Sequence, residues 1–227
     1  MHIGILQTGH VPDDLQTEFG DYDLIFAQLL AGYGFTFSGF AVVDMEFPAG
    51  VEAADGWLIT GSRHGAYEDH PWIAPLEALI RDAYHAAIPL VGICFGHQII
   101  AQALGGKVEK YKDGWGVGRQ TYDFGALGEL AVNAWHQDQV VERPKGAQVM
   151  ASNAFCENAG LVYDDRAWSV QPHPEFPDGY LEGLVHTRGR GLVPDTILDD
   201  ALAQIMLPLA TRQMADEIAA FFKKPRR

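Results

Sequence analysis

Basic residues and cysteines are scarce in this chain of 227 residues. Its 16 lysines and arginines are outnumbered by 30 acidic residues, and the formal net charge of −14 repels phosphate backbones and anionic lipid surfaces. We therefore expect neither a nucleic acid nor a membrane as a partner. The two cysteines, Cys94 and Cys156, are too few for a disulfide framework, which favours a reduced, cytoplasmic setting.

Long apolar runs and several familiar motifs are also missing. No run approaches the roughly 18 to 20 apolar residues of a membrane span, and the chain opens without the features of a signal peptide. Because neither a Walker loop nor a Gly-x-Gly-x-x-Gly turn is present, we expect no cofactor. Metal-ligand spacing is absent too, and we expect His64 and His70 to be solvated loop residues rather than metal ligands.

The spacing of apolar segments predicts an α/β domain. Apolar runs typical of buried strands occupy residues 1–7, 35–43, 56–60 and 88–93, and helical periodicity appears at 23–32 and 71–87. Strands that alternate with helices at this interval indicate βαβ units. The first half therefore predicts a doubly wound, mostly parallel sheet of the flavodoxin-like kind.

Shorter segments follow in the second half of the chain. Strands predicted at 107–111, 116–122, 130–135 and 147–152 indicate a small antiparallel extension, and a last strand at 167–171 leads into His173. Helical spacing from 194 to 222, with a break at Pro208, predicts C-terminal helices. We therefore expect one domain over 1–187 and a helical extension over 188–227 packed on it, ending in a solvated basic tail, 223–227.

A cysteine between two glycines is the strongest candidate for a catalytic residue. In the segment 91–98, Val-Gly-Ile-Cys-Phe-Gly-His-Gln, Cys94 follows an apolar strand and precedes a helix expected at 98–104. This spacing is typical of the nucleophile elbow, a strained turn at the carboxyl end of a sheet. The helix N-terminus and a nearby imidazole would favour the thiolate, and the Phe95 N–H would face a developing oxyanion. Cys156 lacks this setting and is expected to be structural.

Among the nine histidines, His173 is the best candidate for the base that serves Cys94. It stands between Pro172 and Pro174, which stiffen the backbone after the last predicted strand. Residues two apart in an extended segment project to the same side, so Glu175 can accept a hydrogen bond from the His173 ring and fix its tautomer. Cysteine, histidine and carboxylate then form a set of nucleophile, base and orienting group.

These segments resemble the class I glutamine amidotransferase family, whose Gly-x-Cys-x-Gly-x-Gln turn precedes a His-Pro-Glu sequence. Residues 92–98 and 173–175 match the two motifs in the family's order, and the resemblance covers about residues 1–187. It implies that Cys94, His173 and Glu175 form a catalytic triad that cleaves a γ-glutamyl amide through a glutamyl thioester.

The resemblance also implies contacts with the substrate. The segment 58–62 is similar to the family's glycine-rich oxyanion strand, which implies that the Gly61 N–H acts together with that of Phe95. Gln98 would contact the amino-acid head of the substrate. The edge of the glutamine pocket would be formed by Trp115, Gly116, Val117, His136 and Gln137. After Ser62 the loop Arg-His-Gly-Ala-Tyr lacks the proline that is common in the family.

The sequence leaves several functions open. The expected ligand is glutamine or a γ-glutamyl small molecule, and the family includes amidotransferase subunits that serve a synthetase or acceptor subunit as well as stand-alone γ-glutamyl hydrolases and peptidases. A non-catalytic binding or regulatory protein would keep the same fold and have a thiol of ordinary reactivity. An α/β-hydrolase is disfavoured because that fold places its acid between nucleophile and histidine, whereas Glu175 follows His173.

Overall fold

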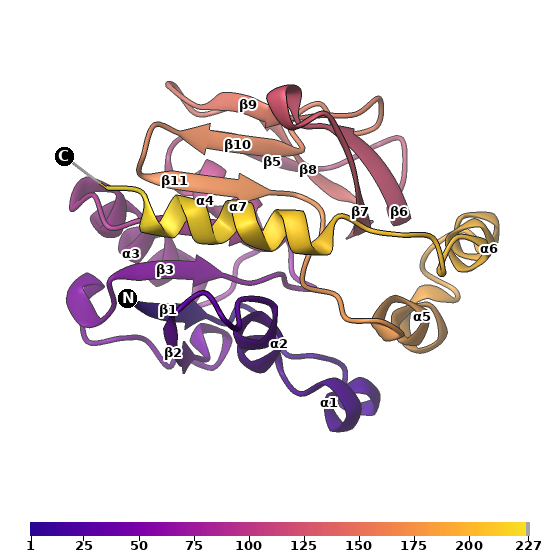
Figure 1. Ribbon diagram of the computed structural model, residues 1–227, viewed down its shortest axis with the longest axis horizontal. Helices are drawn as coiled ribbons and strands as arrows, with labels where there is room; N and C mark the ends of the chain where they lie inside the picture. Colours follow the sequence, from indigo (N-terminus) through magenta and orange to yellow (C-terminus); the bar gives the residue numbers. More distant parts are fainter. Residues whose placement is uncertain (226–227) are drawn as a thin grey trace.

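A seven-stranded, mostly parallel sheet forms the centre of the computed structural model, which describes residues 1–225 (Figure 1). Five neighbouring strands are parallel. In spatial order they are β2 (Thr36–Phe40), β1 (His2–Leu6), β3 (Gly56–Ile59), β4 (Leu90–Ile93) and β11 (Ala167–Val170). Two antiparallel strands, β10 (Gly160–Tyr163) and β9 (Gln148–Ala151), extend this sheet at one edge. The parallel order is the flavodoxin-like one, so the predicted fold class is confirmed.

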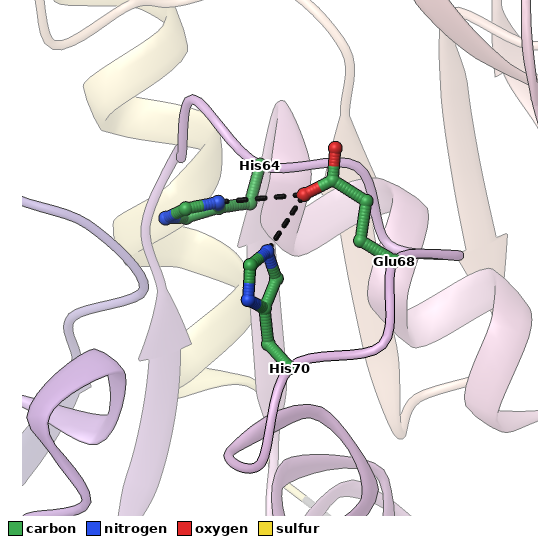
Figure 2. Close-up of side chains that lie close together, drawn as sticks. All are labelled: His64, Glu68 and His70. Atoms are coloured by element: carbon green, nitrogen blue, oxygen red, sulfur yellow. Dashed lines mark hydrogen bonds and ion pairs between the residues drawn. The ribbon is translucent and has the colours of Figure 1, made fainter.

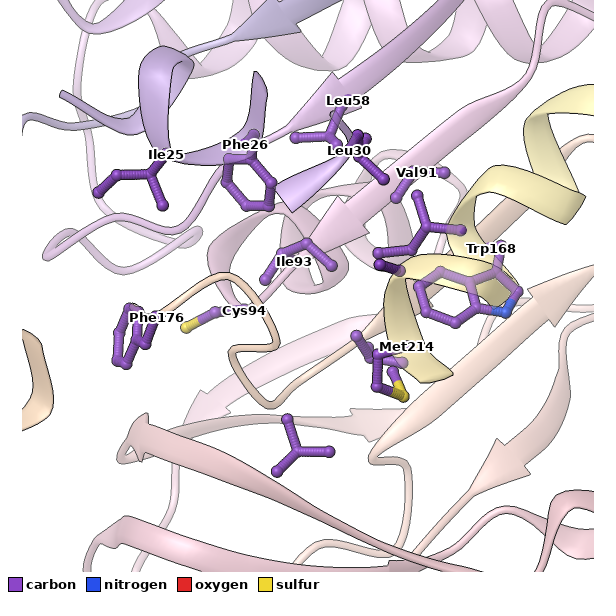
Figure 3. Close-up of a cluster of buried hydrophobic side chains, with 14 of the residues drawn as sticks. Ile25, Phe26, Leu30, Leu58, Val91, Ile93, Cys94, Trp168, Phe176 and Met214 are labelled. Atoms are coloured by element: carbon purple, nitrogen blue, oxygen red, sulfur yellow. The ribbon is translucent and has the colours of Figure 1, made fainter. Parts of the chain in front are cut away.

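Helices cover both faces of the sheet because its strands alternate their apolar side chains between two cores. Leu58 of β3 joins a core with α2 (Tyr22–Leu29) and α7 (Thr211–Lys223), part of which is drawn in Figure 3. Its neighbours Trp57 and Ile59 join the opposite core with α3 (Ile73–His85) and α4 (Phe95–Ala103). Figure 1 shows α7, in yellow, lying across one face of the sheet.

Smaller elements extend from the carboxyl ends of the parallel strands. Two antiparallel pairs are formed by β5 (Lys107–Lys110) with β8 (Asp138–Glu142), and by β6 (Gly116–Asp123) with β7 (Glu129–His136). The remaining α-helices are α1 (Asp13–Phe19), α5 (Tyr180–Leu184), which continues into a π-helical turn at Val185–Gly189, and α6 (Asp195–Ala203). Short 3-10 helices occupy Val42–Asp44, Val51–Ala53 and Gly125–Leu127.

One prediction about the second half needs correction. The strand predicted at 147–152 is β9, which belongs to the edge of the main sheet and not to a separate extension. The break predicted at Pro208 is confirmed, since α6 ends at Ala203 and α7 begins at Thr211. The expected boundary at residue 187 falls inside the π-helical turn, and the last two residues of the basic tail 223–227 lie outside the described residues. Among residues 1–225, no helix combines the length and apolar character that crossing a membrane requires.

The start of α4 lies so close to β3 that only glycine fits at the contact. A Cβ on Gly96 would lie 2.2 Å from the carbonyl oxygen of Ile59, and a Cβ on Gly92 would lie 2.5 Å from the backbone of Gly96. Backbone atoms cannot move away from an added Cβ as the end of a flexible side chain can. The glycines of the elbow therefore set how closely α4 packs on the sheet.

Gly96→Ala is expected to lower the free energy of unfolding by about 3 kcal/mol, because overpacking of this kind forces the backbone to shift. Gly50→Ala is the matched control: its φ of 179° suits any residue, and an added Cβ would meet only the flexible end of Glu52, so its effect should be within about 0.5 kcal/mol. Urea denaturation of both variants measures the difference. Equal losses would contradict the account of the elbow.

Candidate active site

Cys94 occupies a strained turn between β4 and α4. Its backbone has φ 52° and ψ −103°, a conformation that non-glycine residues rarely adopt. The surrounding structure holds the turn from two sides, because the Cys94 N–H donates to the carbonyl of Val170 over 2.8 Å and the Cys94 carbonyl accepts from the Gln98 N–H over 3.1 Å. Figure 3 shows Cys94 beside Phe176 at the end of the apolar cluster. The sulfur is thus placed at the carboxyl end of the central strand.

The side chain of His173 is fixed from three directions. Its backbone N–H donates to the carbonyl of Asn133 over 2.7 Å, which ties this segment to β7. Its ring nitrogen Nδ1 lies 2.6 Å from Oε1 of Glu175, and the ring of Phe176 stacks on it with centroids 4.1 Å apart. His173 and Glu175 are 5% and 3% exposed. The structure therefore brings the predicted pair together in a buried, ordered arrangement.

The charges around His173 favour its protonated form. Burial lowers the pKa of the ring, but the nearby Glu175 carboxylate and Cys94 side chain outweigh burial and raise the pKa above its usual range. The sulfur has a second polar neighbour, since the side-chain amide of Gln171 donates to Sγ of Cys94 over 3.5 Å. By contrast, burial raises the pKa of Cys156 to about 12, which keeps that thiol protonated.

Gly61 follows β3 and faces the catalytic candidates. A Cβ at this position would lie 2.9 Å from Cε1 of His173 and 3.7 Å from Cβ of Cys94, so a side chain would collide with the imidazole. The carbonyl of Thr60 accepts a hydrogen bond from the Gly96 N–H over 3.1 Å. Since a peptide unit is planar and trans, this bond also fixes the direction of the Gly61 N–H, opposite to the Thr60 carbonyl.

Phe95 supplies the second predicted oxyanion group through its backbone. Its side chain points into the core, where its ring packs on Trp72 with centroids 5.4 Å apart. Within residues 1–225, neither the N–H of Phe95 nor that of Gly61 has a hydrogen-bond acceptor. Both groups are therefore available to a ligand.

A cavity of about 640 Å³ opens over the sulfur. Of the predicted substrate contacts, Gln98, Trp115, His136 and Gln137 line it, together with Cys94 and His173. Gly116 and Val117 do not line the cavity. Gly116 lies against the His136 ring, and Val117 packs in an apolar cluster with Val185 and Leu198. Lining residues that the sequence did not indicate include Arg63, His64, Glu68, Lys110, Trp135, Leu184, Arg188 and Leu192.

Two of the lining residues have well-defined polar roles. Nε2 of Gln98 donates to the Asp138 carbonyl and to Oε1 of Gln171, each over 3.0 Å. Burial lowers the pKa of His136 to about 4, so its ring is neutral near pH 7. Its Nδ1 lies 3.2 Å from the Asp138 carbonyl oxygen and must donate to it, which leaves Nε2 as an acceptor with no partner among residues 1–225.

The sequence did not indicate that the loop at 62–70 lines the cavity or that the amide of Gln171 contacts the sulfur. Gln171 directly follows β11, so its position at the carboxyl end of a buried parallel strand, two residues before His173 in the sequence, is the signal that could have indicated it. The expectation that His64 and His70 are solvated is not met: their side chains are only 20% and 33% exposed, and their ring centroids are 4.3 Å apart. The turn between them folds back, which a spacing of six residues does not reveal.

Two solved structures with the same fold are described as glutamine amidotransferases. One from Methylobacillus flagellatus has a TM-score of 0.76 and 23% identity, and covers 98% of this chain and 93% of that one. One from Thermotoga maritima has a TM-score of 0.77 and 21% identity, and covers 99% of this chain and all of that one. At these identities the likeness defines the fold.

Sequence comparison defines the family. The model of the family described as glutamine amidotransferase class-I matches residues 41–181. Gamma-glutamyl peptidase 4 of Arabidopsis thaliana is 34% identical over 183 residues, which cover 74% of this chain and 72% of that protein. The glutamine-hydrolyzing GMP synthase of Burkholderia mallei is 34% identical over 169 residues, which cover 67% of this chain and 29% of the synthase. The chain belongs to the class I glutamine amidotransferase family, and this membership supports an amide-hydrolase function.

Replacing Glu175 with glutamine should lower the pKa of His173, because the carboxylate is the strongest of the groups that raise it. The comparison is made in a Cys94→Ala background, so that the thiol does not contribute to the electrostatics around the ring. NMR titration of the His173 ring should show it losing its proton at a clearly lower pH in Cys94→Ala/Glu175→Gln than in Cys94→Ala. An unchanged midpoint would mean that Glu175 does not control the charge of His173.

Proposed function

We propose that this protein hydrolyses γ-glutamyl amides, with Cys94 as nucleophile, His173 as acid and base, and Glu175 as the group that orients the imidazole. The observation that carries this proposal is that a strained cysteine turn and a histidine held by a buried glutamate line one cavity, where a Cβ on Gly61 would approach both Cys94 and His173. Family membership supports the same class of chemistry.

In the proposed reaction the Cys94 thiolate attacks the side-chain carbonyl carbon of the γ-glutamyl group. The N–H groups of Gly61 and Phe95 stabilise the oxyanion of the tetrahedral intermediate. The His173 imidazolium then donates its proton to the departing amine, which leaves a glutamyl thioester on the sulfur. As the now neutral His173 removes a proton from water, the water oxygen attacks the thioester carbon and the C–S bond breaks. The glutamyl group leaves as the acid, which ionises in solvent, and the Cys94 thiolate and His173 imidazolium are restored.

Recognition of the glutamyl head is assigned to polar groups on the cavity wall. The His136 ring lines the cavity, but its unpartnered Nε2 is enclosed beside Gly116, which does not line it. Arg63, Lys110 and Arg188 also line the cavity and supply positive charge for the carboxylates of the substrate. The amide of Gln98 is held by Asp138 and Gln171, so its effect on the substrate is to position that wall.

A γ-glutamyl peptide is the preferred substrate in this proposal. A cavity of about 640 Å³ is in the range used for ligands well above the size of a single amino acid, which leaves room for a leaving group beyond the scissile bond. Relatives that match over most of their own length include γ-glutamyl peptidases. The second candidate is a glutaminase subunit that passes ammonia to a synthetase, which the likeness to GMP synthase favours.

Purified protein should release glutamate from γ-glutamyl dipeptides, and Cys94→Ala should lower kcat by about 10³-fold or more, because a missing nucleophile leaves only binding and oxyanion stabilisation. Cys156→Ala is the matched control, a buried thiol outside the cavity, and should retain kcat. Turnover of glutamine alone would select the glutaminase candidate. Equal turnover by Cys94→Ala and wild type would refute the assignment of the nucleophile.

A further inference from the structure

The loop between Ser62 and Trp72 gathers two imidazoles and a carboxylate on the rim of the cavity. Figure 2 shows the rings of His64 and His70 both directed at one oxygen of the Glu68 carboxylate. Oε2 of Glu68 lies 2.7 Å from Nε2 of His70 and 3.4 Å from Nδ1 of His64. One oxygen atom is thus shared by two ring nitrogens that come from opposite ends of the turn.

The spacing of these three atoms suits a single transition-metal ion. Ligands at about 2.0 to 2.1 Å from a tetrahedral ion are about 3.3 Å from one another. The potential ligand atoms of His64, Glu68 and His70 all lie within 4.8 Å of one another, so small side-chain rotations would bring them to that spacing. Two imidazoles and one carboxylate are also a ligand set that Zn²⁺ and similar divalent ions prefer.

The surroundings hold the two rings in place. His70 stacks on Trp72 with an interplanar angle of 9°, and His64 meets the same indole edge to face with centroids 5.8 Å apart. Trp72 itself is buried and packs on Phe95. The Glu68 backbone N–H donates to the Gly65 carbonyl over 3.0 Å, which closes the turn. An apolar layer therefore supports the cluster from below, while the Glu68 side chain stays open to solvent.

We propose that His64, Glu68 and His70 bind one divalent transition-metal ion of the Zn²⁺ class, with water in its remaining coordination position. Burial, together with the neighbouring His70 and Arg63, lowers the pKa of His64, which keeps that ring available as a neutral ligand. His64 and Glu68 line the same cavity as Cys94. A bound ion would join the two ends of the loop 62–70, which forms one wall of the cavity, and would hold that wall rigid.

Binding is measured in Cys94→Ala protein without an affinity tag, because the thiolate of Cys94 is itself a strong ligand for Zn²⁺ and would obscure a second site. Co²⁺ is used as a spectroscopic probe, and Zn²⁺ is used for calorimetry and thermal unfolding. The Cys94→Ala protein should bind one equivalent of Zn²⁺, show the visible absorption of four- or five-coordinate Co²⁺, and unfold at a higher temperature with Zn²⁺ than without.

Three substitutions test which residues form the site. Glu68→Gln and His70→Asn, each added to Cys94→Ala, should weaken Zn²⁺ binding by about tenfold to a hundredfold and abolish the shift in unfolding temperature. His85→Gln, which changes an exposed histidine outside the cavity, should leave binding unchanged. Because none of these readouts is enzyme activity, their outcome is separate from that of the proposed hydrolase.

Two results would overturn the proposal. One is the absence of one-to-one Zn²⁺ binding and of the Co²⁺ absorption in Cys94→Ala protein, whose cluster is intact. The other is binding of equal strength in Glu68→Gln and His70→Asn proteins whose circular dichroism matches the parent. If either variant fails to fold, the spectrum of Co²⁺ in the parent, compared with that in Cys94→Ala/His64→Asn, decides the question.

Discussion

The close approach of α4 to β3 at Gly96 is the constraint on which the candidate active site depends. With no side chain at Gly96, the first turn of the helix reaches the carbonyl of Ile59, and the Gly96 N–H donates to the next carbonyl, that of Thr60. This contact fixes the peptide that carries the Gly61 N–H, while the bond from the Gln98 N–H to the Cys94 carbonyl fixes the peptide that carries the Phe95 N–H. The close approach also leaves Cys94 in a backbone conformation that the adjoining helix and strand must sustain. A helix that packed farther from the sheet would separate the sulfur from Gly61.

A buried ion pair supplies the second requirement. Glu175 and His173 are almost fully enclosed, and removing one partner of such a pair typically costs about 3 to 5 kcal/mol because the other is left uncompensated. Phe176 covers the imidazole, and the ring of Tyr180 in turn packs on Phe176. The helix after the His-Pro-Glu segment therefore contributes to the charge state of His173, by excluding water from the pair.

The central sheet and the elbow were predictable from local patterns. Buried parallel strands such as β3 and β4 are short apolar runs, and glycines on both sides of Cys94 indicate a turn that no mid-helix cysteine requires. Strand β8 and the short helix α5 were not predicted, because each depends on a partner distant in sequence. β8 pairs with β5, and α5 packs on α1. The assembly of His64, Glu68 and His70 was hidden for a related reason. A turn that folds back has no periodic signature.

Acid-quenched protein analysed by mass spectrometry would test the central claim most directly, namely that Cys94 carries a glutamyl thioester during turnover. Protein mixed briefly with a γ-glutamyl dipeptide should gain the mass of one glutamyl group on the peptide that contains Cys94, and hydroxylamine should remove it, as expected of a thioester. Glutamate release without any adduct on Cys94, or with an adduct on another residue, would contradict the account.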